Sequence, residues 1–419
     1  MPPHRPAATD TTPTTCSDWP VWKWLAFAAL CVFPIFFSLG NHPIHGDSEA
    51  RYGVVARGMA EGEASWLVPH YFDRPHLTKP PLTYWFMAAS MRVLGDGEWA
   101  LRLPAALAGT ATLAVVFGFT RRRYGLNAAV TATAILSVTP MFVVLSRLAT
   151  TDSFLGLFCT AAMASGILAV RERRQRWAVV FWVATALALL TKGPAGFLPA
   201  AALLLWLAWK RPPGGWSALQ PWLGLPAAAI PVLAWAGLIA SRHPEVWEIW
   251  RYETFDRAVG AGDHPEPWWF FGPVGLVGLL PGSAVLVGWL IVRLRNRVRA
   301  TRGEAAHHSQ TATANSDPTA MNQDHLRQDA PFWVLVIVLI FAVFTLIAGK
   351  LMSYLLPLAA PIVWLVLCVL YFKKWNYKNY LSRLTPKIRP PYLWFTALII
   401  IAALALAEDH LYSHHPPAA

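Results

Sequence analysis

Long apolar stretches alternate along this chain with short polar or basic segments. About eleven of them are long enough to cross a lipid bilayer as helices, which takes roughly 17 to 25 residues each. They lie near 22–39, 99–119, 127–146, 152–170, 177–192, 194–209, 222–240, 269–292, 332–349, 355–372 and 391–407. Several are short or interrupted by proline, so the count carries an error of one or two. The pattern predicts an all-α polytopic membrane protein.

Two shorter helices are expected between the first two spans. The stretch 81–94 is apolar at helical spacing and begins with Pro81, which is typical of an interfacial helix lying on the membrane. Residues 46–63 form an amphipathic pattern in which Tyr52 and Met59 share one face. Both helices fall in a first outer loop.

Basic clusters between the apolar stretches give the orientation. When the spans are counted alternately from a cytoplasmic N-terminus, all of these clusters fall on one side, which the positive-inside rule assigns to the cytoplasm. They are 121–125, 171–176, 209–215, 293–304 and 373–389. The first outer loop therefore faces the opposite, outer side.

Composition agrees with this class. The chain has 419 residues, of which 55% are hydrophobic and only 14% are charged, too few for a soluble domain of this length. The net charge of +12 comes from the basic clusters at span ends and does not indicate a nucleic-acid partner. The four cysteines form no CxxC pair, so neither disulfides nor a zinc site is indicated.

The polar segments divide the chain. The Pro/Thr-rich start does not resemble a cleavable signal, so the first span is expected to be retained. His307 and His308 could bind metal, but a solvated linker is the favoured interpretation of their polar segment. The expected parts are a disordered cytoplasmic tail (1–20), a transmembrane domain (21–292) with its first outer loop (40–98), a cytoplasmic linker (293–330), C-terminal transmembrane helices (331–407) and a short outer tail (408–419).

Isolated charges lie at the outer ends of several spans. Such groups are costly near a membrane unless they face a cavity, pair with each other or bind something. Individual side chains could instead snorkel to the interface. Because eight of them come from separate segments on one side, we expect a shared outward site. These residues are Asp47, Glu49, Lys79, Asp152, Lys192, Arg257, His264 and Lys350.

Two of these residues have specific local contexts. Asp47 opens the 46–63 helix, so an N-cap is the plain alternative to a chemical role, and Glu49 suits the helix dipole. Lys79 lies in "KPP", which forces an extended approach followed by a helix start. A lysine fixed there is suited to pairing with a lipid phosphate.

An ordered set of motifs carries a family resemblance. The acid after the first span is followed by "KPP", "ALRLPAALAG" (100–109), "RLATTDSF" (147–154), "TKGP" and "GKLMSYLLPLAAP" (349–361). Over about residues 20–370 the chain resembles the bacterial GT-C glycosyltransferases that use lipid-linked sugars. Within them it is most similar to the 4-amino-4-deoxy-L-arabinose transferases of lipid A, and protein O-mannosyltransferases are more distant relatives.

The resemblance implies roles for particular residues. Asp47 corresponds to the acid at the reacting centre, which acts as a base or stabilises charge. Lys79, Lys350 and Arg257 are implied as contacts of the donor phosphate. The implied lining of the outward cavity is Glu49, Arg51, Tyr52, Asp152, Lys192, His264 and Tyr354.

Two departures from the family pattern bear on a metal. Ser48 separates Asp47 from Glu49 where the aminoarabinose transferases have adjacent acids, and Thr78 stands where they have glutamate. Both weaken any transfer of a metal site. No cofactor is therefore assigned, and a divalent metal stays open.

The expected activity is transfer of a sugar, with inversion, from a polyprenyl-phosphate donor to an acceptor on the outer face of the cell (inner) membrane. Phosphate is already a good leaving group, so one carboxylate and several cations are sufficient groups to catalyse the transfer. The chain ends soon after its last span, without a sizeable outer domain, so lipid A, another glycolipid, a polysaccharide and a protein all stay open as acceptors. The alternatives are a lipid-linked-sugar transporter or flippase, and a non-catalytic binding relative. A transporter would show repeated halves and mid-span charges, which this sequence lacks.

Overall fold

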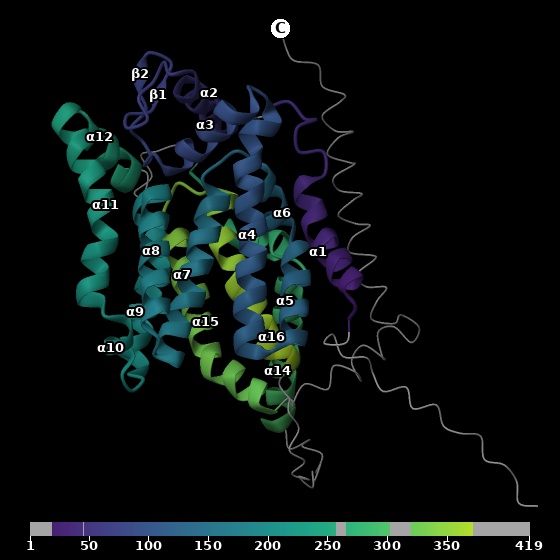
Figure 1. Ribbon diagram of the computed structural model, residues 1–419. Helices are drawn as coiled ribbons and strands as arrows, with labels where there is room; N and C mark the ends of the chain where they lie inside the picture. Colours follow the sequence, from purple (N-terminus) through teal and green to yellow (C-terminus); the bar gives the residue numbers. More distant parts are fainter. Residues whose placement is uncertain (1–18, 45, 257–264, 302–319, 372–419) are drawn as a thin grey trace, which may run out of the picture.

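The structure is a computed structural model that describes residues 19–44, 46–256, 265–301 and 320–371. Within these residues the fold is almost entirely helical, as the hydropathy pattern predicts. The exception is a two-stranded antiparallel ribbon formed by β1 (His70–Tyr71) and β2 (Arg74–Pro75). This ribbon lies in the first outer loop, at the top of Figure 1.

A bundle of long helices makes up the body of the molecule (Figure 1). The central helix α7 (Asp152–Glu172) is buried along nearly its whole length and packs against α4 and α8. The remaining elements of the bundle are α1 (Val21–Phe36), α4 (Glu98–Tyr124), α5 (Leu126–Ser137), α6 (Pro140–Arg147), α8 (Gln175–Lys192), η2 (Gly193–Phe197), α9 (Leu198–Lys210), α10 (Gly215–Leu219), α11 (Pro221–Arg242), α13 (Phe271–Gly278), α14 (Gly282–Thr301), α15 (Ala320–Leu346), η4 (Met352–Leu358) and α16 (Ala359–Tyr371).

The number of spans differs from the prediction. Among the described residues, six helices are long and apolar enough to cross a membrane, or up to eight if each bent pair is one span, so eleven is not confirmed. One of the six covers 175–210, where the chain folds back at η2. At Lys192 the chain is at the outer end of α7, where Lys192 contacts Asp152. By Pro213 the chain has returned to the other end of α7, where the carbonyl of Pro213 accepts a hydrogen bond from Arg173. The predicted span 391–407 lies outside the described residues.

Bends explain part of the difference. The predicted span 127–146 is divided into α5 and α6, which meet at 64°, and Pro140 opens the second piece. The predicted span 269–292 is divided into α13 and α14, which meet at 109°. Hydropathy sums over a window and does not register such bends, whereas a proline removes a backbone donor and favours a new helix start.

Helices also extend into the predicted linker. α14 continues to Thr301 and α15 begins at Ala320, so both enter the polar segment 293–330 from its two ends. Residues 302–319, including the two adjacent histidines, lie outside the described part. The polar residues 293–301 and 320–330 therefore belong to helices.

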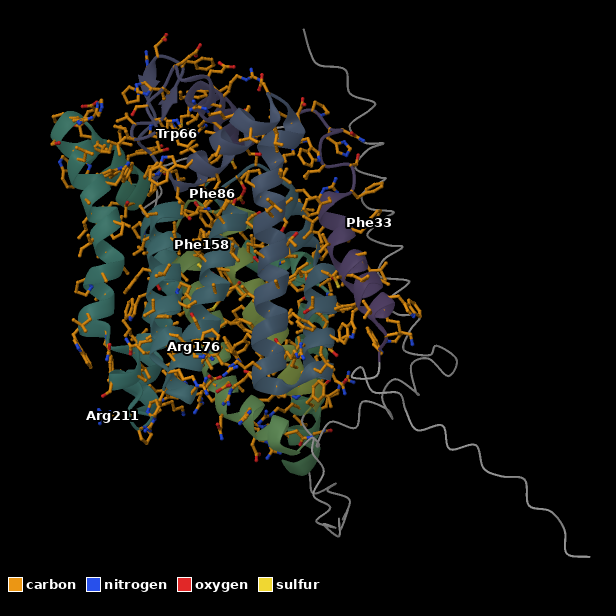
Figure 2. All side chains as sticks on the ribbon, in the orientation of Figure 1. Phe33, Trp66, Phe86, Phe158, Arg176 and Arg211 are labelled. Carbon is orange, nitrogen blue, oxygen red and sulfur yellow. The ribbon has the colours of Figure 1, made fainter. Side chains whose placement is uncertain are left out.

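The end of the bundle opposite the first outer loop is held by a buried carboxylate. Asp329 of α15 has no exposed surface, and it accepts hydrogen bonds from Arg123 Nε at 2.7 Å, Arg171 Nε at 2.9 Å and the Tyr124 hydroxyl at 3.1 Å. These partners come from the ends of α4 and α7. Arg176 and Arg211 lie at the same end (Figure 2), which matches the predicted gathering of basic segments on one face.

We predict that Asp329→Ala lowers the free energy of unfolding by about 3–5 kcal/mol, because it leaves two arginines without their buried counter-ion. Asp324→Ala is the matched control on the same helix, since the Asp324 side chain is 69% exposed and its loss costs at most about 1 kcal/mol. Denaturant unfolding in detergent micelles measures both. Equal destabilisation by the two substitutions would contradict the assignment.

The first outer loop covers the opposite end of the bundle. Its helices α2 (Asp47–Glu61) and α3 (Leu82–Leu94) match the two short helices expected from the sequence. Tyr52 and Tyr84 stack across the pair with ring centroids 5.1 Å apart. Phe86 of α3 stacks on Phe154 of α7, with centroids 5.3 Å apart. The loop therefore packs directly onto the central helix.

One buried ion pair fixes this loop to the bundle. Arg102 of α4 is bidentate to Glu49, with Nε and one terminal nitrogen each 2.9 Å from a carboxylate oxygen. Its remaining N–H groups donate to the carbonyls of Leu39, His42 and Pro43, so a single guanidinium holds the end of the first span and its linker. Glu49 also accepts a bond of 2.9 Å from the backbone of Ala149.

We predict that Arg102→Ala lowers the free energy of unfolding by about 3–5 kcal/mol, because Glu49 and three carbonyls lose their buried donor. Arg57→Ala serves as the control, since the Arg57–Asp96 pair is about half exposed at 53% and 47% and contributes at most about 1 kcal/mol. The same denaturant titration compares the two. A loss no larger than that of the control would show that the pair is not a structural anchor.

Candidate functional site

A cavity of about 290 Å³ lies at the outer end of the bundle, beneath the first outer loop. Its walls come from α2, the segment before α3, the start of α7, the end of α8, the turn after α12 (Val246–Arg251) and the start of η4. The ionisable and aromatic residues that line it are Arg51, Tyr52, His76, Lys79, Asp152, Lys192, Glu253 and Tyr354. Six of these were predicted to share an outward site, and the structure brings them together.

One lysine of the cavity is held tightly. Lys192, the last residue of α8, donates to Asp152 over 2.6 Å and lies 5.0 Å from the ring centroid of Tyr354. Asp152 opens α7, where the helix dipole favours a carboxylate, and it also accepts a bond from the Thr150 hydroxyl. Both side chains of the pair are largely buried, at 13% and 10% exposure, so this part of the wall is rigid.

The second lysine has a more open environment. The Lys79 ammonium lies 3.1 Å from Glu253, and the two side chains are 23% and 17% exposed. The two prolines that follow Lys79 set the chain direction into α3. Arg51 of α2 is exposed on the same wall and makes no ion pair with any described residue. The lining therefore contains Lys79, which is paired with a carboxylate, and Arg51, which has no ion pair among the described residues.

The cavity carries an excess of positive charge, with three cations against two carboxylates. This excess contributes to the lowered pKa of His76. Burial, followed by the nearby Arg51 and Lys79, lowers the pKa of His76 to about 4, while Glu253 acts in the opposite direction. Burial also raises the pKa of the Tyr52 hydroxyl above its ordinary value. Both rings are therefore neutral near pH 7.

Asp47 is not among the residues that line this cavity. It is the exposed first residue of α2, its neighbour Ser48 lines the wall, and it makes no ion pair with a described residue. The cap position of α2 is Gly46, with a φ of 83°, and no side chain caps the helix. The N-cap interpretation of Asp47 is therefore wrong.

Two predicted site residues lie elsewhere. Glu49 does not line the cavity, because its carboxylate is buried against Arg102 two residues from Asp47. The ammonium of Lys350 is also buried and donates to the carbonyls of Glu266 at 2.8 Å and Ala348 at 3.3 Å, whereas the next residue, Leu351, reaches the cavity. Both side chains turn inward because a closer protein partner satisfies them.

The other predicted contacts, Arg257 and His264, lie outside the described residues. Sequence reasoning missed Glu253 and His76. Glu253 comes from the same outer loop as Arg257, but its arrival beside Lys79 depends on how α12 docks. For His76 the only sequence signal was its position three residues before Lys79. Among the described residues, no group of three His, Cys, Asp or Glu side chains could hold a metal ion.

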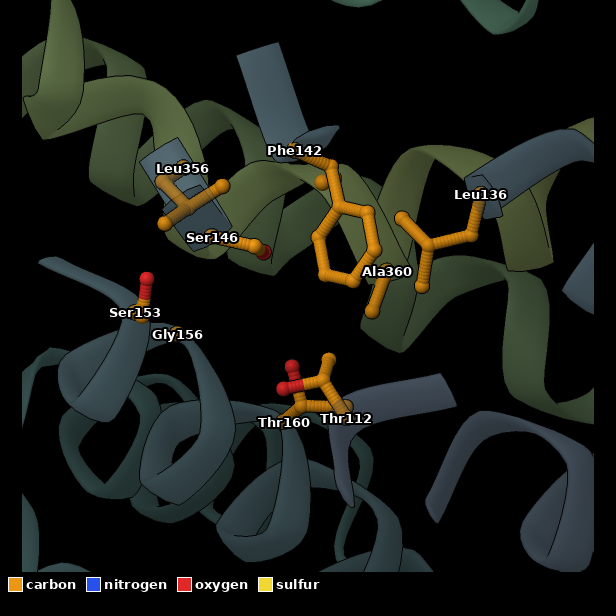
Figure 3. A pocket seen from close by; sticks show the side chains of 10 residues that line it. Thr112, Leu136, Phe142, Ser146, Ser153, Gly156, Thr160, Leu356 and Ala360 are labelled. Atoms are coloured by element: carbon orange, nitrogen blue, oxygen red, sulfur yellow. The ribbon is translucent and has the colours of Figure 1, made fainter. Parts of the chain in front are cut away.

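A second, enclosed pocket lies deeper in the bundle. Figure 3 shows Thr112, Ser146, Ser153 and Thr160 around it. Its volume of about 10 Å³ suits at most one water molecule, so it cannot hold a substrate. Of these two pockets, the outer cavity is therefore the better candidate site.

The chain is similar in sequence to known proteins. Residues 78–236 match the family model described as dolichyl-phosphate-mannose-protein mannosyltransferase. An undecaprenyl phosphate-alpha-4-amino-4-deoxy-L-arabinose arabinosyl transferase from Edwardsiella ictaluri is 28% identical over 351 residues, which cover 81% of this chain and 58% of that protein. The corresponding Pseudomonas aeruginosa (strain LESB58) protein is 26% identical, with 80% and 58% covered. The chain thus spans less than two thirds of these relatives.

Solved structures give the same fold. The crystal structure of ArnT from Cupriavidus metallidurans bound to undecaprenyl phosphate superposes with a TM-score of 0.71 at 23% identity, covering 95% of this chain and 66% of that one. The apo structure of the same protein gives a TM-score of 0.68. The comparisons confirm the resemblance read from the sequence: the chain is a multi-pass membrane protein with the fold of ArnT, and it is similar in sequence to the aminoarabinose transferases and to the protein mannosyltransferase family model.

Proposed function

We propose that this protein is a membrane glycosyltransferase that moves a sugar from a polyprenyl-phosphate donor to an acceptor, with inversion. The observation that carries the proposal is the outer cavity, where Arg51, Lys79 and Lys192 converge from three separate segments. The relatives named for an undecaprenyl-phosphate-linked sugar support a donor of this class.

The cations suit the departing phosphate. When the bond between the sugar carbon and the phosphate oxygen breaks, its electron pair stays on the phosphate, whose negative charge grows. Arg51 and Lys79 are placed to stabilise that charge in the transition state, and after burial they are the next causes that lower the pKa of the neighbouring His76. No general acid is required for such a leaving group.

Asp47 is the better candidate for the base. Asp152 is bound by Lys192 and Thr150, so its oxygens are engaged. Asp47 is exposed, directly precedes the lining residue Ser48, and is the carboxylate that we assign to accept the proton of the acceptor nucleophile as that nucleophile attacks the sugar. A single displacement of this kind inverts the configuration of the sugar carbon.

The proposal extends to partners and place. The acceptor is a lipid, glycan or protein nucleophile, and membrane lipids surround the apolar helices. The cavity lies at the end opposite the arginine-rich segments, which supports an active site on the periplasmic, outer face of the inner membrane.

We predict that Asp47→Asn lowers the transfer rate at least about 100-fold, because an amide cannot accept the acceptor proton. The assay incubates purified protein with radiolabelled polyprenyl-phosphate sugars and membrane extract and follows the labelled product. Asp73→Asn, an exposed residue of the same loop outside the cavity, is expected to retain wild-type activity. Equal rates for Asp47→Asn and the wild type would remove Asp47 from the mechanism.

We predict that His76 makes folding stability fall as the pH drops from about 6.5 to about 4, since the folded state resists protonation that the unfolded chain accepts. The contribution of the neutral His76 ring to the free energy of unfolding is fully present above pH 6.5 and amounts to about 3 kcal/mol at most. In His76→Gln the loss over this pH range is smaller. Unfolding midpoints at several pH values test this, with His243→Gln as the control outside the cavity. Parallel pH profiles for the wild type and His76→Gln would contradict it.

A further inference from the structure

Glu253 brings a carboxylate to the lysine that best fits a donor phosphate. It lies in the short turn η3 (Tyr252–Asp256) after α12, and its Oε2 is 3.1 Å from Lys79 Nζ. The two residues are 174 positions apart in the chain. Both line the outer cavity, so an anion that enters it meets Lys79 with a carboxylate already in contact.

The two lysine–carboxylate pairs of the cavity differ in how firmly they are held. Lys192 and Asp152 lie 2.6 Å apart at 13% and 10% exposure, and Thr150 adds a hydrogen bond. Lys79 and Glu253 are farther apart and more exposed. A partly exposed pair is weakly favourable because water and salt screen it. Of the two pairs, Lys79–Glu253 is the one that an anionic ligand can exchange.

The ion pair is not required to hold α12 against the loop. The indole of Trp250 donates to the carbonyl of Leu77 over 2.9 Å, and that of Trp235 donates to the carbonyl of Leu67 over 3.2 Å. Val246 is fully buried in the apolar contact between these segments. These contacts keep Glu253 within reach of Lys79 whether or not the pair is formed.

We propose that Glu253 is the exchangeable counter-ion of Lys79, which it holds at the cavity wall and yields to the phosphate of a lipid-phosphate ligand. This inference rests on the proposed function, because it presumes that the cavity binds such a phosphate. Entry of the phosphate replaces one anion by another on Lys79. Return of the carboxylate to Lys79 then assists release of the lipid phosphate left after transfer.

The test measures binding of undecaprenyl phosphate to the full chain in lipid nanodiscs. Glu253→Gln removes the competing charge at nearly constant volume, and the dissociation constant is expected to fall about two- to fivefold, the range for a partly exposed ion pair. Glu248→Gln is the matched control, because it removes the charge of an exposed residue of α12 that lies outside the cavity. It is expected to leave the affinity unchanged. A gain of affinity is a result that a merely structural role of Glu253 would not produce.

A double-mutant cycle shows whether the effect acts through Lys79. In the Lys79→Gln background, Glu253→Gln is expected to have no effect, because the cation for which the two anions compete is absent. The same gain in both backgrounds would overturn the counter-ion role in favour of general repulsion. Unchanged or weaker binding by Glu253→Gln alone, with or without a lower unfolding midpoint, would also overturn it.

The proposed function can fail separately. If wild-type protein binds undecaprenyl phosphate no better than undecaprenol, the proposed donor class is wrong and the counter-ion inference falls with it. If the wild type prefers the phosphate but Glu253→Gln shows no gain that depends on Lys79, only the counter-ion inference is overturned.

Discussion

The outer half of this protein depends on the burial of one guanidinium. Arg102 is 4% exposed and directs its N–H groups to Glu49 and to the carbonyls of Leu39, His42 and Pro43. A charge so deeply buried is tolerated only when its donors are satisfied, so the surrounding chain has little freedom to move. Because Glu49 also accepts from the backbone just before α7, this interaction sets α2 relative to the carboxylate and lysine of the opposite cavity wall.

Each end of the bundle contains a buried ion pair, but in the described part of the chain only the outer end also has charges around an accessible cavity. At the arginine-rich end, Asp329 is fully buried against its arginine and tyrosine partners. These ion pairs and hydrogen bonds join α4, α7 and α15. At the outer end, the buried pair lies behind α2, and further charges remain around an accessible cavity. Chemistry is therefore possible at one end, while the other end serves to hold the helices together.

The accessible charges divide into fixed and exchangeable groups. Lys192 and Asp152 form a short, largely buried pair that shapes the wall and keeps the carboxylate engaged. Arg51 and Lys79 lie where an anion can reach them, and Lys79 keeps its contact with Glu253. The two carboxylates balance two of the three cations, which leaves one positive charge in excess for the phosphate of the proposed donor.

The sequence by itself determined the features that depend on neighbouring residues. Hydropathy predicted the membrane class and the helical architecture, and periodicity located α2 and α3, because each is a local sum or repeat. The ordered motifs located Lys79, Asp152 and Lys192. Only the tertiary structure decided that Glu49 turns to Arg102, that Lys350 binds backbone carbonyls, that two predicted spans bend, and that Glu253 reaches Lys79. The physical reason is that a charged side chain takes the best partner within reach in space, and that partner can lie more than a hundred residues away in the chain.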